Sequence, residues 1–175
     1  MKNLITILSV LFFLQFIGIN ASGQDKVIPF FSVGAMHHLG RGGVNAELGC
    51  ENELTKHFSV SGNYRFSYLV GNFGSRVMIN ALALNLSWIV INKNNNRLSV
   101  STGLNAGKYY SLSFNSLDKF NPRYEKDYFD IWWNPAKIQY DHTYSNNIMI
   151  GAYLSLYRDD GDNSNLLGFV IGYKL

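Results

Sequence analysis

Charge is scarce in this 175-residue sequence, because Asp, Glu, Lys and Arg together make up only 15% of it. A soluble domain averages about a quarter charged residues. Aromatic residues are as frequent as charged ones, at 15%. The deficit indicates that much of the folded surface does not need contact with water.

Cysteine is nearly absent, since Cys50 is the only one. A single cysteine excludes an intramolecular disulfide framework and argues against a Cys-based zinc site. A surplus of positive charge is missing as well. Taking Lys2 away with the leader described below leaves 14 of the 15 basic residues against 12 acidic ones. We therefore predict no nucleic-acid partner.

Long apolar runs are confined to the start of the chain. The run from Leu4 to Ile19 follows Lys2 and precedes the small residues Ala21-Ser22-Gly23, which is typical of a cleaved export signal with a mature start near Gln24. An uncleaved membrane anchor is the alternative, but the run is short for a span and Gln15 interrupts it. No cysteine lies beside the cleavage site, so a lipoprotein signal is absent.

These features predict a signal peptide over residues 1–23 and a single domain over residues 24–175. No later run is long enough for a membrane helix. If the mature chain enters a membrane, it must enter as strands.

The mature chain contains stretches in which apolar residues alternate with small polar ones. Leu84 and Leu86, for example, alternate with Asn85 and Ser87. Segments of roughly ten such residues, separated by turn-forming clusters, are typical of a membrane β-barrel. We predict eight strands, at residues 27–38, 44–54, 58–70, 77–91, 97–110, 136–144, 148–157 and 167–175.

An internal repeat orients these strands. Residues 48–68 align without a gap on residues 138–158, so a strand, a turn and a strand form the repeated unit. The turns near Thr55, Asn94 and Ser145 are then expected at one end of the barrel, with the other connections at the opposite end. Short periplasmic turns and longer external loops are typical of membrane barrels.

The last stretch of the sequence has two very different faces. Gly168, Val170, Gly172 and Lys174 form one face, and the other carries large apolar side chains: Leu167, Phe169, Ile171, Tyr173 and Leu175. Small residues facing inward and large apolar ones facing outward suit a narrow barrel surrounded by lipid. This ending resembles the closing strand of bacterial outer-membrane barrels, in which a Tyr stands third from the end and an aromatic residue comes last. Tyr173 matches that pattern, whereas Leu175 stands where Phe is usual.

The mature chain as a whole is similar to the small barrels of the outer-membrane protein A and protein X type. The resemblance implies an all-β fold, an eight-stranded antiparallel up-and-down transmembrane barrel. It also implies outer-membrane lipid and the barrel assembly machinery as partners, a monomeric state, and a role in envelope structure or in adhesion through the loops. We expect neither a cofactor nor an enzymatic activity. A soluble lipocalin-like carrier is a further alternative, which would need large apolar residues inside the barrel.

Charged residues on the inward faces form a predicted lumen network. Its members are Glu47, Glu51, Arg65, Asp141 and Lys174. Because charges in a confined lumen need partners, we expect Arg65 and Lys174 to pair with these carboxylates in a structural role. Gating of a pore is the alternative, although side chains fill the lumen of an eight-stranded barrel.

Two patterns invite a catalytic or metal-binding interpretation. His142 and Ser145 superficially resemble the His-x-Ser motif of outer-membrane lipid A deacylases, which would make the chain a lipid-modifying hydrolase. The separation of three instead of two sends the side chains to opposite faces of a strand, so we predict a turn residue and an interfacial histidine. His37 and His38 are adjacent and point apart, and residues 159–164 lack the Gly and Glu of an EF-hand, so we predict no metal site.

The long connection predicted from Ser111 to Pro135 combines charges with aromatic residues. The aromatic residues are Phe120, Tyr124, Tyr128, Phe129, Trp132 and Trp133. Such a loop is a candidate surface for an extracellular ligand, because aromatic side chains supply contact area and charges orient it. The alternative interpretation is an aromatic belt at the membrane surface, which every such barrel is expected to have.

Overall fold

The chain folds into eight strands. The computed structural model describes residues 26–38, 40–71, 75–113, 123–159 and 162–175. The strands are β1 (Lys26–His38), β2 (Arg41–Glu53), β3 (Phe58–Val70), β4 (Arg76–Lys93), β5 (Asn96–Ser113), β6 (Arg123–Thr143), β7 (Ile148–Asp159) and β8 (Asp162–Tyr173).

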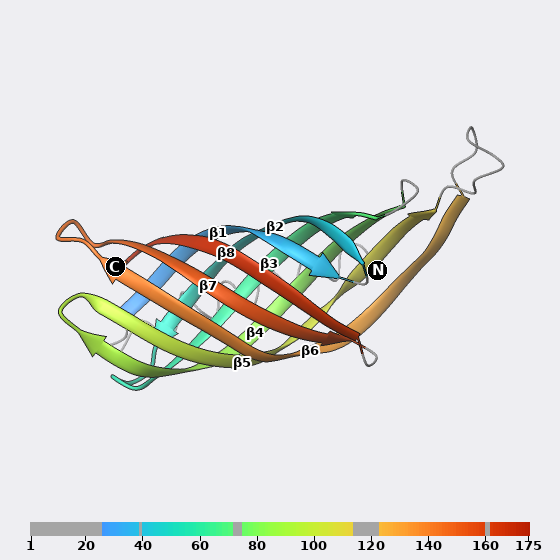
Figure 1. Ribbon diagram of the computed structural model, residues 1–175. Coiled ribbons are helices and arrows are strands. Elements are labelled where there is room, and N and C mark those ends of the chain that lie inside the picture. The colour runs from blue at the N-terminus through green and yellow to red at the C-terminus, as the bar shows by residue number, and fades with distance from the viewer. Residues whose placement is uncertain (1–25, 39, 72–74, 114–122, 160–161) are drawn as a thin grey trace.

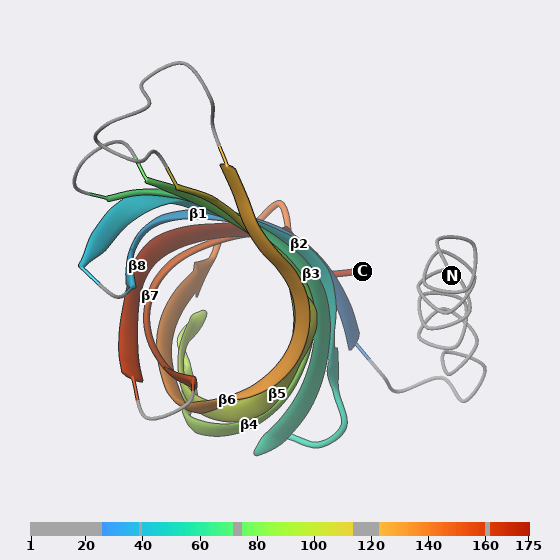
Figure 2. The same cartoon turned by 90° about the vertical axis from the view of Figure 1, so that its right-hand side faces the viewer.

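Each strand pairs antiparallel with its neighbours in the sequence, and β8 returns to pair with β1, which closes the barrel. Figure 2 shows the ring nearly end-on. The predicted fold class, an all-β eight-stranded up-and-down barrel, is confirmed. Among the described residues, no helix is long and apolar enough to cross a bilayer.

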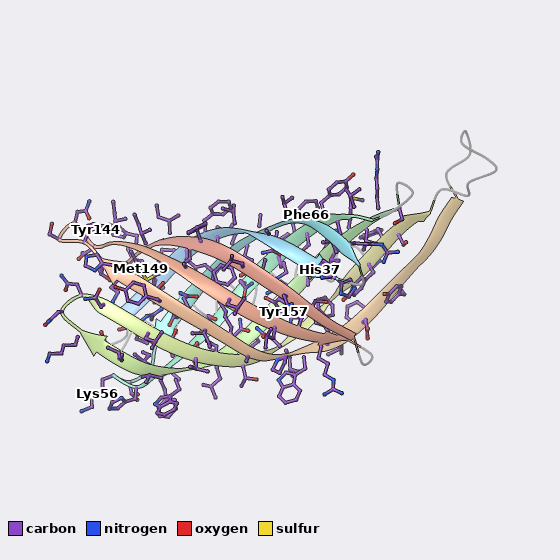
Figure 3. All side chains as sticks on the ribbon, viewed as in Figure 1. His37, Lys56, Phe66, Tyr144, Met149 and Tyr157 are labelled. Atoms are coloured by element: carbon purple, nitrogen blue, oxygen red, sulfur yellow. The ribbon has the colours of Figure 1, made fainter. Side chains whose placement is uncertain are left out.

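Large apolar side chains cover the outside of this barrel, and small polar ones face its lumen. Leu84 and Phe169 are 48% and 67% exposed, whereas Asn85 and Ser87 are each 5% exposed. The same alternation runs along the other strands because successive residues of a strand point to opposite faces. Figure 3 shows Phe66 pointing away from the ribbon. The outside of the barrel is therefore apolar, whereas a soluble carrier would have its large apolar residues inside.

Aromatic side chains gather on the outer surface near both ends of the barrel. Near the short turns they are Phe58, Trp88, Tyr140, Tyr144 and Tyr173, and toward the opposite end they include Tyr64, Phe66, Phe129 and Trp133. Aromatic girdles of this kind are expected where a barrel meets the two surfaces of a bilayer.

Short turns connect the strands at one end, on the left of Figure 1, where the C-terminus also lies. Asn94 and Asn95, with φ of 53° and 64°, form the two-residue connection from β4 to β5. Asparagine tolerates this left-handed conformation better than most residues, which explains the asparagine-rich sequence. In the turn from β2 to β3, Thr55 Oγ1 accepts hydrogen bonds from the backbone N–H groups of His57 and Phe58. We call this end of the barrel the turn end, and the opposite one the loop end.

The prediction of one long connection from Ser111 to Pro135 is wrong. Strand β5 continues to Ser113 and β6 begins at Arg123, so most of that stretch is strand. The error arose because a bulge between Trp133 and Ala136 shifts the alternation by one residue. Tyr124 lies in β6, and Phe120 lies outside the described residues, as do the predicted signal peptide and Asp160.

The side chains that face the lumen are less uniformly small and polar than predicted. Toward the loop end it is filled by large apolar and aromatic side chains, namely Met36, Leu69, Val77, Ile79, Tyr109, Trp132 and Leu166, which we call the apolar plug. Trp132 is only 5% exposed. Assigning it to a surface belt or a binding loop is therefore wrong, because its side chain packs inside the barrel.

Candidate functional site

The lumen near the turn end is organised around Arg97 at the start of β5. Its Nη1 and Nη2 atoms each donate to a different oxygen of Glu51, both at 2.7 Å. Its Nε and Nη2 atoms also donate to Asp141 Oδ2, at 3.1 Å and 3.0 Å. The planar guanidinium thus joins β5 to carboxylates on β2 and β6, and its two-pronged contact with Glu51 is the geometry that arginine favours.

Further groups complete this cluster. Glu53 Oε1 lies 3.4 Å from Arg97 Nη1 and 3.7 Å from Lys174 Nζ. Gln139 Nε2 donates to Asp141 Oδ1 at 2.9 Å. We call Arg97, Glu51, Glu53, Asp141 and Lys174 the ionic layer.

A glycine makes room for this layer. A side chain added at Gly151 on β7 would collide with the Asp141 carboxylate and with the Tyr140 carbonyl oxygen. Asp141 is itself 0% exposed, so it has no space into which to move. The small residue on β7 therefore allows β6 to hold its carboxylate against Arg97.

A second ion pair lies closer to the loop end. Arg65 Nε donates to Glu47 Oε1 at 2.7 Å, and Arg65 Nη1 donates to Asn105 Oδ1 at 3.1 Å. The guanidinium carbon lies 4.3 Å from the centre of the Tyr157 ring. Arg65 is thus held from β2, β5 and β7 at once, and its charge is compensated away from water.

Lys137 lies in the lumen between the two ion-pair clusters. Its ammonium group is 4.3 Å from the centre of the Tyr153 ring. Together with Glu51, Gln139 and Asn85 it lines a cavity of about 10 Å³. Such a cavity has room for about one water molecule. The described lumen is therefore packed with side chains, as expected for eight strands.

The sequence-predicted lumen residues divide between these clusters. Arg65 and Glu47 contact each other directly, whereas Glu51 and Asp141 are bound by Arg97, which the sequence prediction omitted. Lys174 contacts Glu53, which was outside the predicted set. The expected pairing of Lys174 with the predicted carboxylates is therefore wrong.

A usable signal for the missing residues was present in the sequence. Arg97 stands two positions before Ser99 and Lys137 four positions before Asp141, so each has the phase of an inward-facing residue. Each is the first or second residue of its predicted strand, where alternation constrains the direction of a side chain least.

Aromatic stacking stiffens the loop end of the barrel. The rings of Tyr109 and Tyr128 stack with their centres 4.9 Å apart, and Trp132 meets Tyr109 edge-on at 5.2 Å. His38 Nδ1 forms a hydrogen bond with Ser164 Oγ across the β1 and β8 strands. His37 points outward and His38 inward, so the two adjacent histidines do not converge.

Strand β6 extends beyond β7 at the loop end of the barrel, and β5 pairs with it along this extension. They pair as far as Ser113 with Arg123, whereas β7 meets β6 only from Trp133 onward, opposite Arg158. From Arg123 to Trp132, β6 therefore has a strand neighbour only on its β5 side among the described residues. Figure 1 shows this extension at the right. We call the paired residues 106–113 and 123–132 the ribbon.

The free edge of the ribbon can be located in the backbone. The N–H of Ile131 donates to the Asp130 Oδ1 atom of its own strand at 2.7 Å, so it points away from β5. Alternate residues of a strand direct their backbone groups to the same side, so the Phe129 N–H also faces the open edge. Phe129 and Ile131 are 58% and 62% exposed. An open edge with these groups is a template for another strand.

The candidate catalytic pair does not assemble. His142 Nδ1 lies 3.0 Å from Asn96 Oδ1, and its ring meets that of Tyr144 edge-on. Ser145 lies in the turn between β6 and β7, and within the described ranges no hydrogen bond joins it to His142. In that part of the chain no group of three or more His, Cys, Asp or Glu residues is arranged to hold a metal ion.

No protein-family model matches the sequence, and no curated protein is significantly similar to it. Solved structures do match the fold. Neisserial surface protein A (NspA) aligns with a TM-score of 0.65 and 6% identity, over 86% of this chain and 97% of that one. Ail, the attachment invasion locus protein of Yersinia pestis, solved with the heparin analogue sucrose octasulfate, gives a TM-score of 0.56 and 11% identity over 86% and 98%.

The N-terminal β-barrel domain of Pseudomonas aeruginosa OprF gives a TM-score of 0.55 and 12% identity, over 85% of this chain and 97% of that domain. Identities this low show the fold alone. The chain therefore has the eight-stranded barrel fold of small outer-membrane proteins, as the sequence predicted.

Proposed function

We propose that this chain is an integral outer-membrane protein without catalytic activity, and that its ribbon is the part that meets an extracellular partner. The outer-membrane assignment is supported by the apolar outer surface and the aromatic residues at both of its ends. Such a barrel needs surrounding lipid and the assembly machinery that inserts it, and it closes on itself as a monomer.

The observation that carries the binding role is the open edge of β6 between Arg123 and Trp132. A strand edge presents unpaired backbone donors and acceptors, which an extended peptide satisfies by adding a strand. Stacking of Tyr109 on Tyr128 keeps the ribbon ordered before binding, which reduces the entropy lost on binding. Ail, a barrel of the same fold, is named for attachment and invasion.

A backbone substitution tests this role. Phe129→Pro removes an N–H from the open edge, whereas Phe129→Ala removes only the side chain. Phage-displayed peptides would be selected on the mature protein in nanodiscs and their affinities measured by biolayer interferometry. We expect affinity to fall at least about tenfold with Phe129→Pro, since an unpaired partner group costs roughly 1–3 kcal/mol. Phe129→Ala should retain most of the affinity.

Display at the cell surface is checked in parallel. After fractionation, all three proteins should be in the outer membrane and should show heat-modifiable migration on a gel. Protease treatment of intact cells should cleave them only in the ribbon or between its two strands. Peptides that bind Phe129→Pro as tightly as the unsubstituted protein, or a selection that yields no binding peptide, would refute the role of the edge.

A further inference from the structure

Charge is divided unequally between the two surfaces of the barrel. Among the side chains that the structure describes on strands, the carboxylates of Glu47, Glu51, Glu53 and Asp141 all face the lumen. Asp130 is engaged by the N–H of Ile131 at the ribbon edge. The described side chains on the outer surface include the cations Lys108 and Arg158. A membrane surface rich in anions is complementary to this arrangement.

Lys108 and Arg158 lie at the loop-side border of the apolar outer surface. Lys108 on β5 is paired in register with Asn80 on one side and Phe129 on the other. Toward the turn end, the next outward residues after Arg158 on β7 are Leu156 and Leu154. In the described part of the chain, neither cation has an acidic partner within 4 Å. Both therefore lie where the headgroup of a membrane lipid can contact them.

An apolar groove of about 340 Å³ leads up to this border on the outer face. Its lining includes Val60, Leu84, Leu86, Leu104 and Trp133. The indole of Trp133 donates from Nε1 to Thr102 Oγ1 at 2.9 Å, which fixes the wall of the groove. Arg158 is the cross-strand partner of Trp133, so the groove ends beside a positive charge.

We propose that this face of β4 to β7 binds a lipid with a phosphate-bearing headgroup in the outer leaflet. An acyl chain lies in the groove below Trp133, and the phosphate is bound by Arg158, with Lys108 adding positive charge on the other side of β6. Guanidinium and ammonium groups are the side chains that bind phosphate in proteins. The apolar groove selects a lipid over free phosphate. This inference rests on the proposed membrane location and adds to it the chemistry of the lipid.

The test compares matched charge removals in the full mature protein. Wild-type protein in detergent micelles would be titrated with bisphosphorylated lipid A, with its enzymatically dephosphorylated form and with inorganic phosphate, and bound species counted by native mass spectrometry. The double variant Lys108→Ala/Arg158→Ala removes the proposed cations. The control Lys56→Ala/Lys93→Ala removes two exposed cations at the turn end, and Lys108→Arg/Arg158→Lys keeps both charges.

We expect the wild-type protein to bind the phosphorylated lipid and the double alanine variant to bind it about 25-fold more weakly. A basic residue near an anionic membrane surface contributes roughly a factor of five. The turn-end control and the charge-conserving variant should stay within about threefold of the wild type. Dephosphorylated lipid should bind as weakly to the wild type as phosphorylated lipid does to the double variant, and inorganic phosphate should not compete.

Equal binding of the two lipid forms, equal losses in the alanine variant and the turn-end control, or competition by inorganic phosphate would overturn the proposal. The outer-membrane assignment fails separately, if the protein does not fractionate with that membrane. The ribbon's role is tested by Phe129→Pro, which keeps both Lys108 and Arg158. If the protein inserts into the membrane and binds peptides but does not distinguish the two forms of the lipid, this inference alone is refuted.

Discussion

Arg97 is almost fully buried and bridges two carboxylates that are buried with it. Removing ions from water is expensive, so such a cluster is weak evidence of high stability. Its effect is clearer when one member is lost, because the remaining charges then have no partner. Arg97 on β5 therefore links this strand to β2 and β6.

Replacing Arg97 with alanine should lower the free energy of unfolding by about 3–5 kcal/mol, because Glu51 and Asp141 are left buried without their cation. Urea titration followed by tryptophan fluorescence in phospholipid vesicles measures this change. The control Lys93→Ala removes an exposed cation and should change the stability by less than about 0.5 kcal/mol. Similar stabilities for the two variants would mean that the ionic layer does not hold the strands together.

The sequence predicted the partner of a charged lumen residue only where that residue lies in the middle of a clearly alternating strand. Glu47 and Arg65 lie in the middle of clearly alternating strands, and they contact each other. Lys174 was expected to bind the same carboxylates, but it follows the end of β8 and lies near Glu53 instead. Alternation says which face a side chain occupies. The partner it meets depends on the stagger between strands, which a single sequence does not contain.

At the scale of the element, β4 and β8 are the strands that the sequence predicts best. Large apolar residues alternate with smaller ones from Ala81 to Trp88 in β4 and from Leu167 to Tyr173 in β8, and these residues have the predicted faces in the structure. Strand β6 was predicted poorly. Its first half carries aromatic residues on both faces, and its bulge near Ala136 breaks the period of two. A bulge inserts one extra residue, so the residues beyond it no longer match an alternating pattern with a period of two.

Strand β8 offers a test of the lipid-facing surface. Phe169→Arg places a charge on the most apolar part of the strand and should destabilise the barrel in vesicles by about 2–4 kcal/mol, the cost of a basic residue near the bilayer midplane. Phe169→Leu keeps that surface apolar and should cost less than about 1 kcal/mol. Unfolding by urea in vesicles gives both values. If arginine were tolerated as well as leucine, this face of β8 would have to contact water.

At the scale of the whole molecule, two different barriers close the lumen. The apolar plug fills the loop end and the ionic layer fills the turn end, with Arg65 and Lys137 between them. Ions meet apolar side chains at one barrier and fully engaged charges at the other.

We therefore expect the purified protein to produce no steady ion conductance in planar bilayers, with a sixteen-stranded porin as the positive control. Insertion would be verified by recovering folded, heat-modifiable protein from the same vesicles. Reproducible unitary steps that vanish on substitution of Arg65→Gln would show instead that the lumen conducts and that its charges control the path.

The pairing of β8 with β1 has a consequence for how the molecule is made. Phe30 lies opposite Gly172, and the N–H of Leu175 donates to the carbonyl oxygen of Val27. The ring is thus closed by its first and last strands, so it cannot close before β8 has been synthesised. Until then the edges of β1 and β8 stay unpaired, and unpaired strand edges expose the incomplete barrel to aggregation.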